Sequence, residues 1–318
     1  GVTLSYLLCR VADTVEDAVM LTPQRKGELL GLYGSALDDP DGDLSPFATA
    51  LPGRDDADAV LTGRAAEIMA LFHAQPLAVR EAVAPWVADM CRGMAEFSGR
   101  KPEVIATTPP RTWRGLHTEH ELERYCYYVA GTVGHLLTAL FAALRPGLGA
   151  RRVARMEALA EDFGAGLQLV NILADVARDH ERGVSYVPAE TCAAAGLAAP
   201  DLLQEDRRHQ ARGVLVGLAE QARRRLRAAR EYCQLLPRAE YQLRLFCLIP
   251  YFLALRTLRA LHEDPVYPAA GQRVKVGRST VRRTLVAAQF CAASNHLLRA
   301  YSRRLDGAVW DSQSLRSA

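Results

Sequence analysis

Apolar residues recur at helical spacing along most of this chain. They step by three or four positions through one long stretch, at Val153, Met156, Ala160, Phe163, Leu167 and Val170, which places them on one face of a helix. No segment shows the sustained two-residue alternation of β-branched residues that indicates strands. The pattern therefore predicts an all-α fold in which strands are absent or trivial.

Proline and glycine clusters divide the helical pattern into segments. We predict helices over residues 2–20, 23–37, 57–75, 77–97, 118–144, 151–182, 205–235, 238–262 and 279–304. No internal repeat is evident, and no Ser/Gly-rich linker separates two halves. We therefore expect one domain over residues 1–318.

Composition narrows the class of protein. The 318 residues are 49% hydrophobic and 24% charged, which suffices for a sizeable core. A net charge of +3 and an aromatic content of 7% argue against a nucleic-acid partner. The seven cysteines are scattered without a CxxC pair, which predicts a reducing, cytoplasmic environment. Residues 125–144 reach the length of a membrane span, but their tyrosines and threonines favour a buried core helix.

Two of the predicted helices carry polar stripes. Residues 166–183 are apolar in nearly every direction, as in a buried helix, except for a stripe at spacings of 3, 4 and 4: Gln168, Asn171, Asp175 and Asp179. Residues 6–17 repeat this design at spacings of 4, 3 and 4 with Tyr6, Arg10, Asp13 and Asp17, and Glu16 lies beside that stripe.

Carboxylates on buried helices restrict what the stripes can face. An ionised carboxylate that is buried without a partner costs several kcal/mol, so each stripe must face cations or water. Mg²⁺ binds oxygen ligands and is typically held by one or two carboxylates together with substrate phosphates. The stripes therefore predict Mg²⁺-bound diphosphate. The alternative, ordinary exposed acids at helix ends, accounts less well for the same design occurring twice.

Several ordered motifs carry a family resemblance. They are DxxED at 13–17, MCRGMAEF at 90–97, YCYYVAGTVG at 125–134, QLVNILADVARD at 168–179, RGVSYVP at 182–188, FCLIPYFLALRTL at 246–258 and VKVGR at 274–278. Together they resemble the squalene/phytoene synthase family of head-to-head prenyl synthases, and most of all its bacterial squalene synthases.

The resemblance implies a fold and a reaction. The fold would be the all-α isoprenoid synthase fold, with helices around a central apolar cavity. Two farnesyl diphosphates would condense with Mg²⁺ to presqualene diphosphate, which NADPH would reduce to squalene. A phytoene or dehydrosqualene synthase, which needs no reductant, and an inactive helical adaptor with the same fold remain alternatives.

The resemblance also assigns roles to residues. The expected metal ligands are Asp13, Glu16, Asp17, Asn171, Asp175 and Asp179, and the expected catalytic residues are Tyr128 with Asp13, Asp17, Asp175 and Asp179. Tyr6, Arg10, Gln168, Arg178 and Arg182 would bind the diphosphates, while Phe246, Cys247, Leu248 and Pro250 would line the hydrocarbon pocket.

The reductant needs a different kind of site. No GxGxxG turn exists in the chain, so the phosphates of NADPH would need cationic side chains, and we assign them to Lys275 and Arg278. The alternative interpretation is that residues 274–278 form a solvated basic loop that binds no ligand.

Departures from the family pattern leave diphosphate affinity at the second site an open question, and Arg178 and Arg182, about one helical turn away, are candidates to compensate. Ala174 stands where the family commonly has a basic residue, and Val184 stands where many members have an arginine. We also expect the family's Ser-rich segment before the first acidic helix to be missing from this chain. We expect a cytoplasmic monomer with a peripheral membrane contact for product release.

Overall fold

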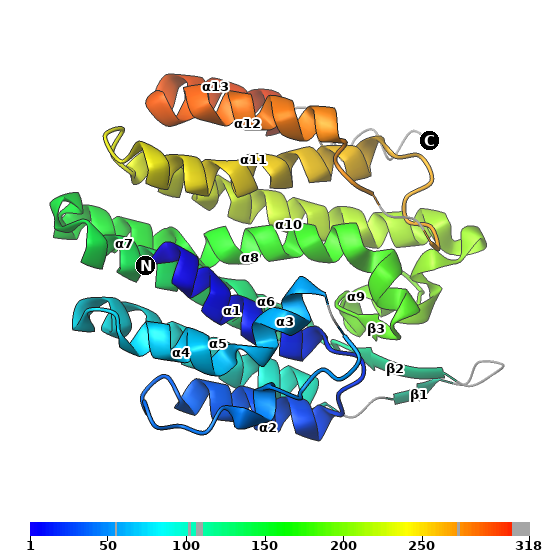
Figure 1. Cartoon of the computed structure of the whole chain (residues 1–318). Helices are drawn as coiled ribbons and strands as arrows, with labels where there is room; N and C mark the ends of the chain where they lie inside the picture. Colours follow the sequence, from blue (N-terminus) through cyan, green and yellow to red (C-terminus); the bar gives the residue numbers. More distant parts are fainter. Residues whose placement is uncertain (55, 101–102, 106–110, 272–273, 307–318) are drawn as a thin grey trace. The chain divides into compact units, whose positions relative to one another are not determined.

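Helices make up nearly all the regular structure in the computed structural model, which describes residues 1–54, 56–100, 103–105, 111–271 and 274–306 (Figure 1). The chain divides into two compact units. Unit 1 comprises Gly1–Lys101 and Tyr127–Val153, and unit 2 comprises Pro102–Cys126 and Ala154–Ala318. The single domain over residues 1–318 stays a prediction.

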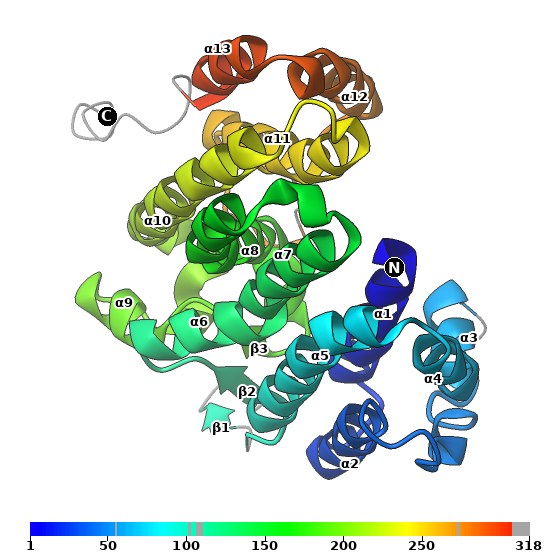
Figure 2. The same cartoon turned by 90° about the vertical axis from the view of Figure 1, so that its left-hand side faces the viewer.

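Unit 1 is built around one long helix. Its elements are α1 (Val2–Asp17), α2 (Pro23–Ser35), η1 (Ser45–Phe47), α3 (Ala57–Gly63), α4 (Ala65–His73), α5 (Leu77–Ser98), the π-helical turn η2 (Tyr127–Gly131), α7 (Thr132–Leu144) and η3 (Pro146–Leu148). Helix α5 packs against α1, α2 and α7 (Figure 2). Side chains of α1, α2 and α5 share one buried apolar core, which fixes the orientation of α1 within this unit.

Unit 2 contains the longer helices and a small sheet. Its elements are β1 (Glu103–Ile105), β2 (Arg111–Gly115), α6 (Glu119–Cys126), α8 (Ala150–Glu181), β3 (Val184–Ser185), α9 (Ala189–Ala194), η4 (Ala199–Leu203), η5 (Glu205–Arg207), α10 (Arg208–Leu235), α11 (Tyr241–Glu263), α12 (Arg278–Ala293) and α13 (Asn295–Asp306). Strand β2 pairs antiparallel with β1 and parallel with β3. The described strands span two to five residues, so the all-α prediction is confirmed.

Two predicted helices are each broken into two. The segment 57–75 breaks at Arg64, directly after Gly63, where the backbone leaves the helical region (φ −101°, ψ 22°). The segment 279–304 breaks at Ser294, whose backbone is extended (φ −146°, ψ 119°). The Ser294 hydroxyl accepts a hydrogen bond from the Leu297 amide at 3.4 Å, as an N-cap residue does, so a new helix starts there.

Arg244 ties the helices of unit 2 together. Its side chain is fully buried on α11. It donates to the carbonyl oxygens of Ala292 (2.7 Å), Cys233 (3.1 Å) and Leu236 (2.5 Å), and to Asn295 Oδ1 (2.6 Å). These carbonyls lie at the ends of α10 and α12, where a helix lacks internal partners for its last C=O groups. One cation therefore satisfies the ends of two helices.

By length and composition alone, two described stretches could cross a membrane: Glu119–Leu144 and Tyr241–Glu263. Core helices of soluble proteins meet the same criterion. In the second stretch, Arg244 is hydrogen-bonded to protein groups and the neighbouring Cys247 and Leu248 are buried, as expected of a core helix. The length and composition of the two stretches are therefore weak evidence for a membrane span.

Replacement of Arg244 tests this account of unit 2. Arg244→Met is expected to lower the free energy of unfolding by about 3–5 kcal/mol, because it leaves several buried carbonyls without a donor. Arg238→Met is the matched control, since Arg238 is exposed. Urea unfolding of both variants measures the difference, and equal midpoints would contradict the role given to Arg244.

Candidate functional site

The first acidic stripe lies on α1 in unit 1. One side of this helix is fully buried through Leu8, Val11, Ala12 and Val15. Asp13 is partly buried beside that face, while Asp17 is exposed. Burial raises the pKa of Asp13 to about 7, the carboxylates of Asp17 and Asp58 add to the rise, and Arg10 opposes it. A cation bound here would therefore stabilise a carboxylate whose ionisation the fold disfavours.

Arg10 is held by a residue that sequence reasoning missed. Its Nε donates to Asp58 Oδ1 at 3.0 Å and its Nη2 to Asp58 Oδ2 at 2.5 Å, which makes a two-point ion pair with the first turn of α3. The hydrogen bond raises the pKa of Arg10 and lowers that of Asp58. Asp58 thus fixes the direction of the guanidinium that we expect at a diphosphate.

A second missed cation lies at the end of α1. The buried Lys26, on α2, donates its Nζ to the carbonyl oxygen of Glu16. A positive charge is favourable at a helix C-terminus because the last carbonyls carry partial negative charge. Arg10 and Lys26 therefore place basic groups close to both ends of the DxxED segment.

The second stripe lies on α8 in unit 2. The helix buries Leu169, Val170, Ile172, Leu173 and Val176, so its apolar surround is as predicted. The stripe itself ranges from exposed Asn171, through partly buried Gln168 and Asp175, to buried Asp179.

Two contacts order this stripe. Asn171 Nδ2 donates to Gln168 Oε1 at 3.4 Å, and Arg182 Nη1 lies 3.7 Å from Asp179 Oδ1. Of the two arginines expected to bind diphosphate near this stripe, Arg182 lies beside Asp179, whereas Arg178 is exposed. The second stripe therefore has a basic neighbour of its own.

The end of α8 is fastened to the small sheet. Gly183 has a φ of 68°, a left-handed conformation that favours glycine and lets the chain leave the helix. Its carbonyl oxygen accepts from the Arg114 amide at 2.8 Å, at the start of the β2–β3 pairing. The sequence predicted that the helix ends here, but not that the chain after it pairs with β2 and so fixes the carboxylate-bearing turn of α8.

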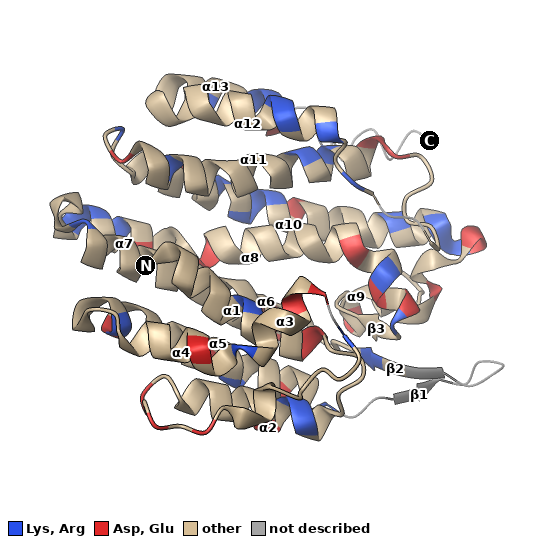
Figure 3. Cartoon of the chain, viewed as in Figure 1, with Lys and Arg blue, Asp and Glu red and all other residues tan. Residues whose placement is uncertain are grey.

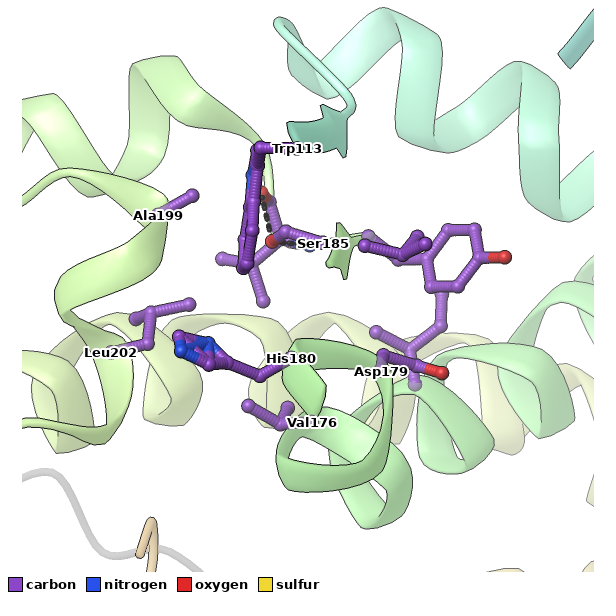
Figure 4. Close-up of a pocket in the computed structure, with 11 residues that line it drawn as sticks. Trp113, Val176, Asp179, His180, Ser185, Ala199 and Leu202 are labelled. Carbon is purple, nitrogen blue, oxygen red and sulfur yellow. Dashed lines mark hydrogen bonds between the residues drawn. The ribbon is translucent and has the colours of Figure 1, made fainter. Parts of the chain in front are cut away.

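A small pocket lies beside this turn (Figure 4). Trp113, His180 and Leu202 are among its lining residues, and its volume of about 10 Å³ is roughly that of one water. The carboxylate of Asp179 points away from the His180 ring in Figure 4. This pocket is too small for an isoprenoid substrate.

The segment after α11 is also anchored to α8. Arg212 donates to the carbonyl oxygens of His262 (2.7 Å), Asp264 (2.8 Å) and Tyr267 (3.0 Å). The buried Tyr267 hydroxyl donates to the carbonyl oxygen of Leu173 at 2.8 Å, two residues before Asp175. These anchors lie between distant parts of the sequence, and no local motif indicates them.

Tyr128 lies on the π-helical turn η2, in unit 1. π-Helical turns inside helices are rare and frequently occur at functional sites. The turn packs closely on Gly93, since a Cβ there would lie 2.0 Å from Tyr128 Cγ. The neighbouring Tyr127 hydroxyl donates to Asp89 Oδ2 at 2.8 Å. Gly93 therefore lets the Tyr128 ring pack on α5, and Asp89, also on α5, holds the neighbouring Tyr127.

The expected hydrocarbon-pocket residues divide between two environments. Cys247 and Leu248 are 2% and 0% exposed in the core of unit 2, whereas Phe246 is 43% exposed. Phe246 and Pro250 are four residues apart and share a face of α11. The expected reductant-binding residues, Lys275 and Arg278, are both exposed, and Arg278 is the first residue of α12.

The donor set of each stripe suits Mg²⁺. Among the described residues, no three His, Cys, Asp or Glu side chains are grouped closely enough to hold a metal by themselves. Mg²⁺ commonly takes only one or two carboxylates and completes its shell with phosphate oxygens and water. The partly buried Asp13, with its raised pKa, fits such a cation.

An all-helical fold with carboxylates on two largely buried helices is that of the isoprenoid synthases. Residues 1–280 match the family described as squalene/phytoene synthase, and the chain belongs to that family. The predicted family and fold are thereby confirmed.

Individual relatives agree with this assignment. The chain is 30% identical over 193 residues to a squalene synthase of Eremothecium gossypii, covering 60% of this chain and 40% of the relative. It is 44% identical over 87 residues, 27% of each chain, to a phytoene synthase of Thermus thermophilus. The alignments with the first squalene synthases span less than half of those proteins' length.

Solved structures share the fold. The complex of TcSQS with the ligand E5700 has a TM-score of 0.77 at 24% identity and covers 96% of this chain and 82% of that one. A dehydrosqualene synthase complex has a TM-score of 0.58 at 20% identity, over 95% and 86% of the two chains.

The close packing of Tyr128 on Gly93 gives a prediction. Gly93→Ala is expected to reduce turnover and to cost about 1–3 kcal/mol of stability, because the added methyl forces the Tyr128 ring to move. Gly31→Ala is the matched helical control, since nothing lies within 4 Å of its added Cβ. Thermal unfolding and product formation are measured for both, and a Gly93→Ala enzyme with wild-type turnover would refute the positioning role.

The raised pKa of Asp13 gives a prediction about stability. The pKa of Asp13 in the folded state is about 7, above the ordinary value of 3.8. The contribution of the protonated Asp13 side chain to the free energy of unfolding is therefore complete below about pH 4 and is lost as the pH rises toward 7. Asn cannot ionise. Asp13→Asn is therefore expected to melt at a higher temperature than the wild type in metal-free buffer at about pH 8, with a smaller difference at about pH 5.

The control for Asp13 is on the same helix. Asp17→Asn removes one carboxylate from an exposed position and is expected to have a smaller effect on the melting temperature. Calorimetry at both pH values measures it. A lower melting temperature for Asp13→Asn at pH 8 would show that its carboxylate stabilises the folded chain.

Proposed function

We propose that this protein is a squalene synthase that condenses two farnesyl diphosphates to presqualene diphosphate and reduces this with NADPH to squalene. The observation that carries the proposal is the pair of acidic stripes, each on a helix whose other faces are largely buried, in a chain of the squalene/phytoene synthase family. Farnesyl diphosphate has an apolar chain and a charged diphosphate, and a carboxylate stripe on an otherwise apolar helix provides charge for the diphosphate next to apolar surface for the chain.

The stripes would bind the diphosphates. Asp13, Glu16 and Asp17 hold one Mg²⁺–diphosphate, and Asn171, Asp175 and Asp179 hold the other. Bound Mg²⁺ supplies positive charge that stabilises the departing diphosphate. Arg10, already directed by Asp58, donates to diphosphate oxygens, as does Arg182 beside Asp179. Arg178, Tyr6 and Gln168 complete the contacts.

Tyr128 would act at the reacting carbon atoms. Its hydroxyl assists the first ionisation or takes part in proton removal. This role requires a fixed ring, and the close fit against Gly93 supports it. The carbocation survives only where water is excluded. We assign the lining of the hydrocarbon pocket to Phe246 and Pro250, which share one face of α11, while Cys247 and Leu248 pack behind them in the core of unit 2.

Lys275 and Arg278 would serve the reductive step. Both side chains are exposed and cationic, and Arg278 begins α12, where free backbone N–H groups favour phosphate. The second candidate is a phytoene or dehydrosqualene synthase, which uses no reductant. The stretch that is 44% identical to a phytoene synthase favours this candidate.

The proposal includes a cellular setting. The enzyme acts in the cytoplasm as a monomer and releases an apolar hydrocarbon at a membrane. The membrane contact is peripheral.

The decisive experiment is a product assay. The protein is incubated with radiolabelled farnesyl diphosphate and Mg²⁺, with and without NADPH, and the extracted hydrocarbons are separated. Squalene that forms only with NADPH supports the proposal, whereas a conjugated C30 polyene formed without NADPH indicates the second candidate. Asp175→Asn, checked by circular dichroism, is the inactive control. If no product forms under any condition, the remaining interpretation is an inactive helical adaptor with the same fold.

The reductive half-site gives its own prediction. Lys275→Ala combined with Arg278→Ala is expected to accumulate presqualene diphosphate while squalene output falls at least about tenfold, because two charge-assisted contacts to phosphate are lost. Arg282→Ala with Arg283→Ala, one turn further along α12, is the control pair. Equal loss of both products in the Lys275/Arg278 variant would refute a reductive role.

A further inference from the structure

The outer faces of α12 and α13 expose apolar side chains. Helix α12 buries Thr284, Ala288, Cys291 and Ala292. Its opposite face presents Val286 and Phe290, which are 48% and 63% exposed. On α13, Leu297 is 45% exposed. An outward face of a helix that carries valine and phenylalanine in place of charged residues needs an explanation.

The exposed charged side chains of α12 and α13 are of one sign. Residues 278–305 contain six arginines and neither aspartate nor glutamate. Arg282, Arg283, Arg299 and Arg303 are exposed, and none forms an ion pair within the part of the chain that the structure describes. Figure 3 shows basic positions on both helices. We call these four arginines, with Val286, Phe290 and Leu297, the α12–α13 face.

A second basic region of unit 2 differs in this respect. The arginine-rich run on α10 is partly neutralised, since Arg223 pairs with Asp306 at 2.9 Å and Arg225 with Asp162 at 2.6 Å. Arg224 and Arg227 of this run are exposed, but this run lacks the exposed large apolar side chains found on α12. Positive charge and exposed apolar area therefore coincide on the α12–α13 face.

We propose that the α12–α13 face binds the surface of an anionic lipid bilayer. Helices with apolar side chains beside arginines lie in the interface of such membranes, with the apolar groups among the headgroups and acyl chains. Each arginine near an anionic surface strengthens binding by about fivefold.

A second copy of this chain suits the face poorly. A two-fold dimer places the same patch on both partners, so the arginines would face arginines. An anionic membrane complements their charge. The proposal identifies the surface that makes the peripheral membrane contact. The purpose of that contact, release of a hydrocarbon product, rests on the proposed function, whereas the lipid contact itself does not.

Vesicle sedimentation tests the charge. The full chain is mixed with phosphatidylcholine vesicles with or without about 30 mol% phosphatidylglycerol. Wild-type protein is expected to bind only the anionic vesicles, and less at high salt. Arg282→Gln with Arg283→Gln is expected to weaken binding by about 25-fold. Arg224→Gln with Arg227→Gln removes the same charge from α10 and is expected to weaken it less than about threefold.

A separate variant tests the apolar contact. Phe290→Ser keeps every charge and is expected to weaken vesicle binding by about tenfold. Leu71→Ser is the control, because Leu71 on α4 is 57% exposed against 63% for Phe290, and it is expected to bind as the wild type does.

Condensation of farnesyl diphosphate in vesicle-free buffer is measured for all variants and is expected to be unchanged. Absence of product from the wild-type protein, together with intact vesicle binding, would refute the proposed function and leave the surface assignment standing.

Three results would overturn the assignment. One is absence of wild-type binding to anionic vesicles. Another is a loss of vesicle binding in the Arg224/Arg227 variant as large as that in the Arg282/Arg283 variant, which would indicate non-specific charge attraction. The third is a concentration-dependent dimer in light scattering that Phe290→Ser abolishes, which would make the face an interface between copies.

Discussion

The desolvation of carboxylates on largely buried helices is the constraint on which the rest of this structure depends. Helix α1 must pack Leu8, Val11 and Val15 into the core of unit 1, and the same packing withdraws Asp13 from water and raises its pKa to about 7. The fold therefore maintains a carboxylate whose ionisation it disfavours. A site that binds a divalent cation explains why such a residue is useful, because the cation removes the penalty.

The surrounding residues hold each stripe in place within its own unit. In unit 1, Asp58 fixes Arg10, Lys26 contacts the end of α1, and Gly93 admits the Tyr128 ring. In unit 2, Tyr267 is fastened to α8 two residues before Asp175. The groups expected to meet the substrate are thus set by neighbours that need not touch it.

The helices and both stripes could be predicted from the sequence because they are local patterns of three and four residues. The partners of those stripes could not be, since Asp58 lies 48 positions from Arg10 and nothing in the local sequence connects them. The breaks at Arg64 and Ser294 depend on single residues within otherwise helical stretches. The π-helical turn at Tyr127–Gly131 packs against α5, a contact between distant segments that local helix propensity does not contain.

The central claim is that both stripes bind diphosphate through Mg²⁺. Calorimetric titration with the unreactive analogue farnesyl thiodiphosphate tests it most directly, in Mg²⁺ and again in EDTA. The account predicts two bound analogues per chain in Mg²⁺, none with measurable affinity in EDTA, and loss of one site in Asp13→Asn and of one in Asp175→Asn. Binding that is unchanged by EDTA and by both substitutions would contradict it.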